Sequence, residues 1–396
     1  MKNDKITLRS EDFAKWYTDV VKAARLADYS SVKGFVILEP NGYAIWEKMQ
    51  SIMDSMFKKL GHQNVYLPVL IPENMLKKEA ELVEGFAPEV AWVTLGGSKK
   101  LEERLAFRPT SETLFSDYYR STVKTYRDLP KLYNQWCSVI RWEKETRPFL
   151  RTREFLWQEG HTMHATEAEA KQETLRMLDI YDKMGRDLLA VPFVKGRKTE
   201  KEKFAGALET YSIEALMHDG KALQSGTTHY FGDGFARAFN IQYLDKDGKI
   251  KTPYQTSWGV STRLLGSIIM VHGDDNGLVL PPYVAPIQVV IIPIKMNEPG
   301  VLDKTREIKA KLEEAGIRVK LDDSDKTPGW KFSEYEMKGI PLRLEIGPKD
   351  LANNSCMICK RNDGTKEKYS LDEIESTITS LLEKVHKEMY NAALKH

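Results

Sequence analysis

The proline pair Pro281-Pro282 divides the sequence into two segments with different hydrophobic patterns. Before it, Tyr133 to Glu143 and Glu154 to His164 alternate in residue type and are rich in aromatic and β-branched side chains, which predicts two antiparallel strands. After it, buried-type strands and amphipathic helices alternate at short intervals, which predicts an α/β fold with a largely parallel sheet. Because prolines interrupt regular structure, we predict a domain boundary here, with domains at 1–282 and 283–396.

The fold class predicted from these patterns is α+β for the first domain, an antiparallel sheet flanked by helices. A helix is expected after Ser10, which is placed to cap it, and a longer one after the capping box formed by Thr166 and Glu169. The second domain is smaller and of α/β type. Its expected elements are a strand at 288–292, a helix at 303–315 ended by Gly316, a strand at 317–321, a helix at 331–338, a strand at 342–346 and a last helix from 371 to about 393.

Composition narrows the class of protein. The 59 Lys and Arg residues nearly balance the 57 Asp and Glu residues, which argues against a surface coated in positive charge for unspecific nucleic-acid binding. Three cysteines are too few for a disulfide framework and fit a reducing compartment, so the cytoplasm is expected. The amino terminus from Met1 to Lys5 has no apolar core of a signal peptide, and no apolar stretch is long enough to span a membrane.

Arg141 and Glu143 lie two residues apart on a predicted strand, so their side chains are expected on one face. Arg151 follows in the loop beyond. An Arg fork binds phosphate, and a nearby carboxylate can accept from an amino group or help to hold Mg²⁺. From these residues alone, an ordinary cross-strand ion pair is the favoured alternative.

Two further segments place polar groups beside predicted helix starts. Arg263 follows Ser261 at the start of an apolar helix, which combines a cation with free backbone N–H groups and suits a phosphate. Thr110 and Glu112 precede another apolar helical run and offer acceptors to a small ammonium group. For both segments, an ordinary helix start is the more common explanation. For Thr110 and Glu112 this start would be an N-terminal capping box.

Three other groups have a structural and a functional explanation. Phe155, Trp157, Glu159 and His161 alternate onto one face of the second predicted strand and can form a pocket floor, although an aromatic stripe is more often core. The polar stretch from Gln224 to His229 can face a ligand, although a single histidine is usually a satisfied buried one. Cys356 and Cys359 have the spacing of half a zinc site, but without a second pair they are interpreted as strand cysteines.

The order of these segments resembles the three signature motifs of class II aminoacyl-tRNA synthetases. Gly34 to Gly42 with Trp46 is similar to the first motif, Arg141 to His161 to the second, and Gly259 to Arg263 to the third. Finer matches resemble prolyl-tRNA synthetases of the archaeal and eukaryotic type. These matches are Phe107 to Glu112, Trp157 to His161, Tyr254 to Gly259 and Pro328 to Phe332.

The resemblance implies a catalytic domain of class II architecture, followed by an anticodon-binding domain. It implies activation of L-proline with ATP to prolyl-adenylate, release of pyrophosphate, and transfer of proline to tRNA(Pro). Arg141 and Arg263 would be the catalytic residues. The proline pocket would consist of Thr110, Glu112, Arg141, Trp157, Glu159, His229 and Ser257. ATP and its Mg²⁺ would be bound by Arg141, Glu143, Arg151, Phe155, Gln224, Thr227, Ser261 and Arg263. Anticodon bases would be read by Glu336, Arg343, Lys349 and Asp350, and the first motif implies a homodimer.

The sequence departs from the family pattern in two places. The span from His161 to Gln224 leaves no room for the editing domain that bacterial-type relatives insert, so misactivated alanine is not expected to be cleared in cis. We also expect this chain to lack the further C-terminal domain that is usual in the archaeal and eukaryotic subclass, through natural loss or truncation. Two alternatives stay open: a catalytically silent synthetase-like module that binds tRNA or a protein, and a synthetase for another amino acid of the same subgroup. The intact Arg and Glu positions count against the first, and the Thr110 to Glu112 segment and the lack of Cys or His zinc ligands around the pocket count against threonine as the substrate.

Overall fold

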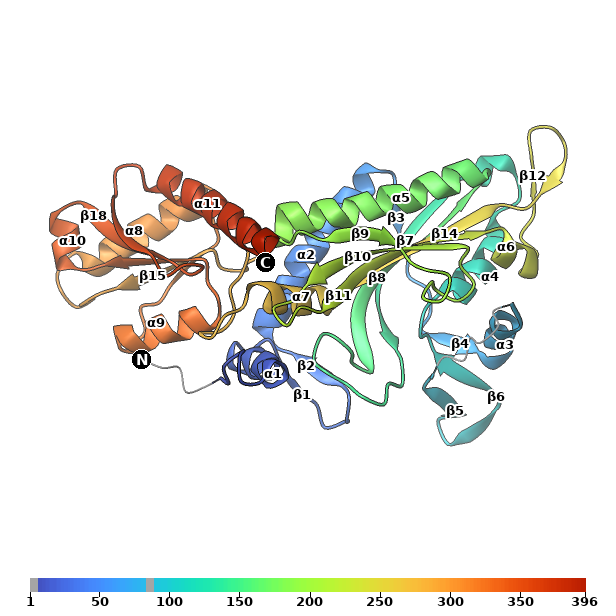
Figure 1. Ribbon diagram of the computed structural model, residues 1–396, viewed down its shortest axis with the longest axis horizontal. Helices are drawn as coiled ribbons and strands as arrows, with labels where there is room; N and C mark the ends of the chain where they lie inside the picture. The colour runs from blue at the N-terminus through green and yellow to red at the C-terminus, as the bar shows by residue number, and fades with distance from the viewer. Residues whose placement is uncertain (1–5, 83–88) are drawn as a thin grey trace.

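The computed structural model describes residues 6–82 and 89–396 and builds them around two large sheets that lie side by side along the long axis of the molecule (Figure 1). Met1 to Lys5, where no signal peptide was expected, lie outside the described residues. The larger sheet has seven strands, antiparallel except for the short parallel pair β3–β7. Its order is β3 (Gln63–Asn64), β7 (Lys131–Ile140), β8 (Glu154–His164), β14 (Tyr254–Ser261), β11 (Ala222–Gly232), β10 (Glu209–Leu216) and β9 (Val194–Arg197).

One face of this sheet is covered by helices, which leaves the other face for a site. Trp258 and Val260 of β14 belong to the main apolar core, together with residues of α1, α2, α5 and α7. The alternate residues Ser257 and Ser261 point to the opposite face, as the period of two requires. The covering helices are α1 (Phe13–Ala23), α2 (Pro40–Lys59), α5 (Glu167–Met184) with the π-turn η2 (Gly185–Leu189), and α7 (Arg263–His272).

Smaller elements surround the large sheet. The three-stranded sheet β4–β6–β5 carries α3 and lies near α4 (Figure 1), and β1 with β2 forms a separate two-stranded sheet. Their bounds are β1 (Ala27–Tyr29), β2 (Val36–Leu38), β4 (Leu70–Pro72), α3 (Glu73–Leu82), β5 (Trp92–Gly96), β6 (Lys99–Phe107), α4 (Glu112–Thr122), η1 (Tyr126–Asp128), α6 (Gly234–Ala238), β12 (Tyr243–Leu244) and β13 (Ile250–Lys251). Together with the large sheet, they confirm the predicted α+β class of the first segment.

The second large sheet has the order β16–β15–β17–β18–β19. The first three strands are parallel, as predicted, but β18 and β19 run antiparallel to their neighbours, so the expectation of a largely parallel sheet was wrong for this edge. Its strands are β15 (Val289–Pro293), β16 (Val319–Leu321), β17 (Leu342–Ile346), β18 (Ser355–Lys360) and β19 (Lys366–Ser370). Its helices are α8 (Val301–Glu314), α9 (Pro328–Met337), α10 (Pro348–Ala352) and α11 (Ile374–Lys395).

The starts of two helices show how far local sequence patterns predicted the N-cap residues. Thr166 caps α5, and its hydroxyl accepts from the backbone N–H of Glu169 at 3.2 Å, which confirms this half of the predicted capping box. At α1 the prediction of Ser10 as the cap was wrong, because the carboxylate of Asp12 accepts from the N–H of Lys15 at 2.9 Å.

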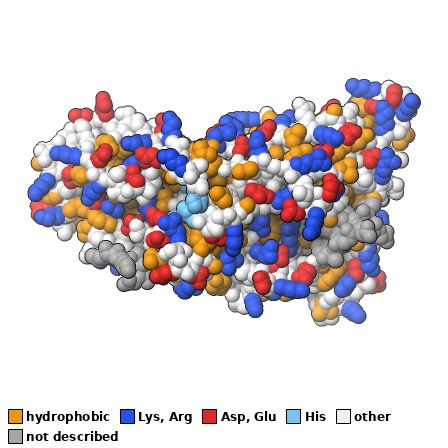
Figure 2. All heavy atoms as spheres, in the orientation of Figure 1, with side chains coloured by type: hydrophobic (Ala, Val, Ile, Leu, Met, Phe, Trp, Pro, Cys, Tyr) orange, Lys and Arg blue, Asp and Glu red, His pale blue; other side chains and the backbone are white. Residues whose placement is uncertain are grey.

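The distribution of surface charge and the character of the helices agree with the class of protein that the composition predicted. Acidic and basic side chains are interspersed over the face shown in Figure 2, without a coat of one sign. Among the residues that the structure describes, no helix combines the length and apolar character needed to cross a membrane.

Candidate active site

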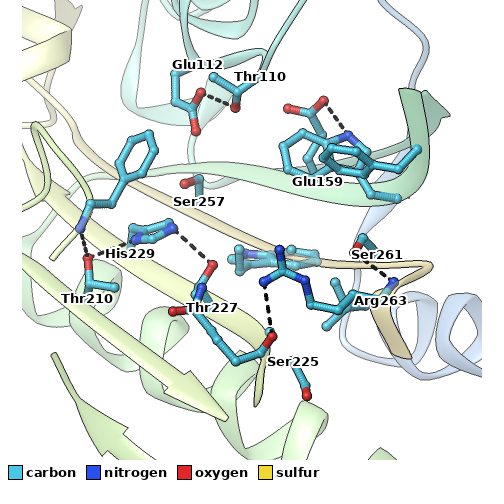
Figure 3. A pocket seen from close by; sticks show the side chains of 18 of the residues that line it. Thr110, Glu112, Glu159, Thr210, Ser225, Thr227, His229, Ser257, Ser261 and Arg263 are labelled. Atoms are coloured by element: carbon cyan, nitrogen blue, oxygen red, sulfur yellow. Dashed lines mark hydrogen bonds between the residues drawn. The ribbon is translucent and has the colours of Figure 1, made fainter. Parts of the chain in front are cut away.

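A cavity of about 250 Å³ lies over the open face of the large sheet, where β8, β11 and β14 meet (Figure 3). It brings together most residues that the sequence assigned to proline and ATP. Those lining it are Thr110, Glu112, Arg141, Phe155, Trp157, Glu159, Gln224, Thr227, His229, Ser257, Ser261 and Arg263. Since three antiparallel neighbours supply most of these side chains, a rigid sheet fixes their spacing.

One wall is formed by the start of α4. The Thr110 hydroxyl donates to the Glu112 carboxylate, and both side chains are buried. The expected capping box was wrong: Ser111 is the N-cap residue, but its hydroxyl donates to Glu159 at 2.8 Å and makes no cap hydrogen bond. The polar groups of this segment therefore face the cavity and its floor instead of serving the helix.

A second carboxyl group lies behind this wall. Glu79 of α3 is only 2% exposed and accepts from the hydroxyl of Thr113, the neighbour of Glu112. Burial, reinforced by the nearby charge of Glu112, raises the pKa of Glu79 to about 8. Glu79 is therefore mostly neutral at pH 7.

The floor is centred on the buried carboxylate of Glu159. Burial alone raises its pKa, but the net pKa is lowered because His161 donates at 2.6 Å and Ser111 and Gln135 donate as well. The indole N–H of Trp157 adds a fourth contact at 3.1 Å. Glu159 thus stays ionised and holds Trp157 and His161 in place below the cavity.

The opposite side of the cavity carries His229 (Figure 3). Its two ring nitrogens lie 2.9 Å from the Thr210 hydroxyl and 3.2 Å from the Thr227 hydroxyl. Burial, with a smaller contribution from His161, lowers the pKa of His229 to about 3. The imidazole is therefore neutral at pH 7 and acts as a hydrogen-bonding wall, not as a cation.

Arg141 joins the cavity to a neighbouring hollow of about 270 Å³, which Glu143 also lines. The expectation that both residues lie on one strand was wrong, because β7 ends at Ile140. Arg141 still continues the ladder, with its N–H donating to the Arg153 carbonyl at 2.8 Å, and the chain then turns at Glu143. The guanidinium lies 5.5 Å and 5.4 Å from the ring centroids of Phe155 and Trp157, and its Nε donates to the Pro109 carbonyl at 2.9 Å.

Arg263 is the first residue of α7 and faces the cavity from the far end of β14. Its backbone N–H donates to the Ser261 hydroxyl at 3.1 Å, and its side chain donates to the carbonyls of Leu150 and Gln224. Arg151 does not line the cavity and is exposed, but it lies close enough to lower the pKa of Arg263, after burial and Arg141. The cations therefore gather at one end of the site.

Sequence reasoning missed a group of residues on the segment after β9 and at the start of β10. Lys198, Glu202, Phe204 and Thr210 also line the cavity. The centroid of the Phe204 ring lies 4.8 Å from that of the His229 ring, and the backbone N–H of Phe204 donates to the Thr210 hydroxyl at 3.0 Å. A lone aromatic residue within a run of charged ones was the only indication of this wall in the sequence.

The residues assigned to the anticodon lie in the second part of the chain and do not all meet. Glu336 and Arg343 line a common hollow, where the guanidinium of Arg343 lies 4.1 Å from the Phe332 ring centroid. Lys349 and Asp350 lie on α10 and do not line it. Asp350 accepts from the N–H of Gly347 at 2.9 Å and so stabilises the start of its own helix.

The two cysteines with the spacing of half a zinc site belong to one strand. Cys356 and Cys359 both lie in β18, as the interpretation of two strand cysteines predicted. Within 6–82 and 89–396, no three His, Cys, Asp or Glu side chains are grouped as a metal site.

Comparison with known proteins gives two family matches and several close relatives. Residues 92–272 match the tRNA synthetase class II core domain (G, H, P, S and T), and residues 288–381 match the anticodon binding domain. The chain is 62% identical to a proline–tRNA ligase of Ruminiclostridium cellulolyticum over 98% of its own length and 81% of that protein. It is 61% identical to one of Lachnoclostridium phytofermentans, covering 100% and 84%, and 60% identical to a proline–tRNA ligase 2 of Bacillus cereus, covering 98% and 81%.

Proposed function

Because this chain belongs to the proline–tRNA ligase family of class II aminoacyl-tRNA synthetases, and thus activates proline with ATP and charges tRNA with it, we propose that the cavity over β8, β11 and β14 is its activation site. The observation that carries this assignment is the convergence of a buried acid wall and two arginines on one 250 Å³ cavity. Proline is a small zwitterion whose ammonium group needs an acidic wall, and the triphosphate of ATP needs cations. The cavity offers both kinds of group side by side.

We infer that the two ends of the cavity bind the two substrates. The wall of Thr110 and Glu112 accepts from the secondary ammonium of proline, since a buried carboxylate forms strong charge-assisted hydrogen bonds. Trp157 and neutral His229 enclose the apolar ring, above Glu159 and beside Ser257. At the other end, Phe155, Gln224, Thr227, Ser261 and Arg263 surround ATP, with Glu143 and Arg151 next to them.

Arg141 and Arg263 are the proposed catalytic groups. Attack of the prolyl carboxylate on the α-phosphorus forms the adenylate and expels pyrophosphate, and it needs alignment and charge stabilisation without a protein nucleophile. Arg141 lines both hollows and reaches the carboxylate and the α-phosphate together. In the second step, a terminal ribose hydroxyl of tRNA attacks the acyl carbon and AMP leaves.

We propose that Mg²⁺ enters with ATP. Mg²⁺ usually binds through substrate phosphates and one or two carboxylates, and Glu143 supplies one carboxylate beside Arg141. When bound, the ion would neutralise charge on the phosphates. The lack of a three-ligand cluster in the described residues fits a metal that arrives with its nucleotide.

The second part of the chain is proposed to read the anticodon. Arg343 and Glu336 share a hollow, where a planar fork and a carboxylate can pair with base edges. Lys349 and Asp350 are proposed to contact neighbouring nucleotides from α10.

We assign the catalytic domain to 1–282 and the anticodon-binding domain to 283–396. We also propose a cytoplasmic enzyme, because its three cysteines are all free.

The proposed subclass is the archaeal and eukaryotic type without the editing insertion. Between β8 and β11 the chain forms only α5, the π-turn, β9 and β10, which belong to or pack on the large sheet. A pocket that fits proline rejects the smaller alanine by only ~1–3 kcal/mol per methylene. We therefore expect alanine to be activated slowly and not cleared by this chain.

Pyrophosphate exchange with each of the twenty amino acids tests this assignment. Proline is expected to give the fastest exchange, with alanine weaker by roughly 10–200-fold per lost methylene. Alanyl-tRNA made by the chain is expected to persist when the purified chain is added back. Rapid hydrolysis of alanyl-tRNA by this chain would contradict the proposed subclass without affecting proline activation.

We propose that the two-stranded sheet β1–β2 is the centre of a homodimer interface. Tyr29, Val32 and Ile37 are 54%, 54% and 55% exposed. The open edges of a two-stranded sheet favour pairing with another strand. This sheet includes part of the segment similar to the first motif.

Sedimentation analysis of single variants tests the dimer. The unmodified chain is expected to sediment as a dimer, and Ile37→Glu is expected to shift it to a monomer because a charge would be buried at the interface. Leu95→Glu is the matched control, since Leu95 is equally exposed on the separate strand β5. A dimer unaffected by Ile37→Glu would place the interface elsewhere.

A further inference from the structure

A tyrosine outside the cavity contacts the loop that leads to its cationic end. Tyr17 lies in α1 and is fully buried, and its hydroxyl donates to the Pro148 carbonyl at 2.5 Å. Pro148 belongs to the loop between β7 and β8, 131 residues further along the chain. Burial raises the pKa of Tyr17, although Arg147 and Arg263 lower it, so the hydroxyl remains protonated as a donor. The hydrogen bond therefore links α1 to this loop.

The loop has a tight and strained backbone. The N–H of Arg147 donates to the Arg151 carbonyl at 2.7 Å, and the N–H of Arg151 donates back at 3.0 Å. Between them, Phe149 has a φ of 62°, a left-handed conformation that is rare for a bulky residue. Such a conformation persists only where surrounding contacts hold it. The Pro148 carbonyl, which also accepts from Leu150 at 2.8 Å, is one of the points where the loop is held.

The same loop contacts Arg263. The Leu150 carbonyl accepts from the Arg263 Nε at 3.1 Å, and the Leu150 side chain packs on Gly266 of α7. A Cβ at Gly266 would come within 2.4 Å of Leu150 Cδ2 and 3.2 Å of the Tyr17 hydroxyl. Helix α1, the loop and α7 thus meet at one close contact, where Arg151 follows Leu150 in the loop and Arg263 begins α7.

We propose that Tyr17 is a positioning residue for the activation step: its hydroxyl holds the loop so that Arg151 and Arg263 face the phosphates of ATP. This role rests on the proposed ATP end of the cavity. The expected effect is larger for ATP than for proline: of the residues assigned to proline only Arg141 lies in this loop, whereas Thr110, Glu112 and His229 make their hydrogen bonds elsewhere.

The variant Tyr17→Phe removes only the hydroxyl and tests this role. In pyrophosphate exchange, KM for ATP is expected to rise roughly three- to tenfold, the effect of one lost neutral hydrogen bond, while KM for proline rises clearly less. Tyr243→Phe is the matched control, because Tyr243 is also buried and its hydroxyl donates to the Ala165 carbonyl away from the cavity. Thermal unfolding of both variants measures how much of any change is structural.

Two results would overturn the inference. One is a folded Tyr17→Phe protein with an unchanged KM for ATP. The other is a loss shared equally by both substrates, as a general loosening of the fold would give. Arg263→Ala in the same assay separates this inference from the proposed site. If Arg263→Ala raises KM for ATP and Tyr17→Phe does not, the proposed ATP site is supported and the positioning role of Tyr17 is contradicted.

Discussion

Replacing Arg141 by alanine is expected to slow proline-dependent pyrophosphate exchange about a hundredfold, the usual loss when one preorganised donor to a transition-state charge is removed. The guanidinium is held between Phe155 and Trp157 and by the Pro109 carbonyl. Burial lowers its pKa, but Glu112, Glu143 and Glu159 oppose that shift and favour the cation. The charge is therefore fixed in place before substrates arrive, and no side chain must reorganise during the reaction.

Two companion variants sharpen this experiment. Arg141→Lys keeps a positive charge but loses the planar fork, so an intermediate rate is expected. Arg237→Ala is the control, because Arg237 is 70% exposed on α6 and pairs with Asp233, and such surface pairs are worth at most ~1 kcal/mol. A fall of less than about fivefold for Arg141→Ala would mean that Arg141 does not stabilise the transition state, given the size of such effects elsewhere.

Local patterns in the sequence predicted the type of each element better than its end. Alternation from residue 133 onward correctly indicated two antiparallel strands, but it did not show that the first stops at Ile140. The stop depends on the loop that follows, which is held by contacts with Tyr17 and Arg263 from distant parts of the chain. Periodicity carries no information about contacts across 100 residues or more.

The Thr110 to Glu112 segment shows the same limit at the level of a side chain. A capping box and a pocket wall need the same residue types at nearly the same spacing, so the pattern alone favoured the common explanation. The hydroxyl of Ser111 is instead engaged by Glu159, 48 residues away on β8. The residues alone offered a pocket wall as the less common explanation, and the resemblance to a known family, which combines several distant segments, favoured it.

Two features gave almost no indication in advance. Phe204 lines the cavity from an irregular segment of charged residues, where no period of two or 3.6 exists to mark it. The antiparallel direction of β18 was also missed, because strand direction depends on the connection. The short helix α10 between β17 and β18 does not make the crossover that a parallel pair needs.

The second large effect is expected at the acid wall. Glu112→Gln keeps the shape of the side chain but removes the charge that we assign to the proline ammonium. Losing a charge-assisted hydrogen bond costs roughly 1.5–3 kcal/mol, so KM for proline is expected to rise about ten- to a hundredfold. KM for ATP should change little, because Glu112 lies at the end of the cavity away from Arg263 (Figure 3).

Glu79→Gln is the matched control for this variant, since it makes the same chemical change at a buried carboxyl group just behind the wall. Burial and the charge of Glu112 raise the pKa of Glu79 to about 8, so this carboxyl group is already mostly neutral at pH 7. Because Glu79 carries little charge at pH 7, its replacement by glutamine removes little charge from the site. KM for proline is therefore expected to change by less than about threefold, which corresponds to less than the free energy of one pKa unit. If both variants weakened proline alike, the wall would act through its packing, and the charge of Glu112 would not be what selects the ammonium group.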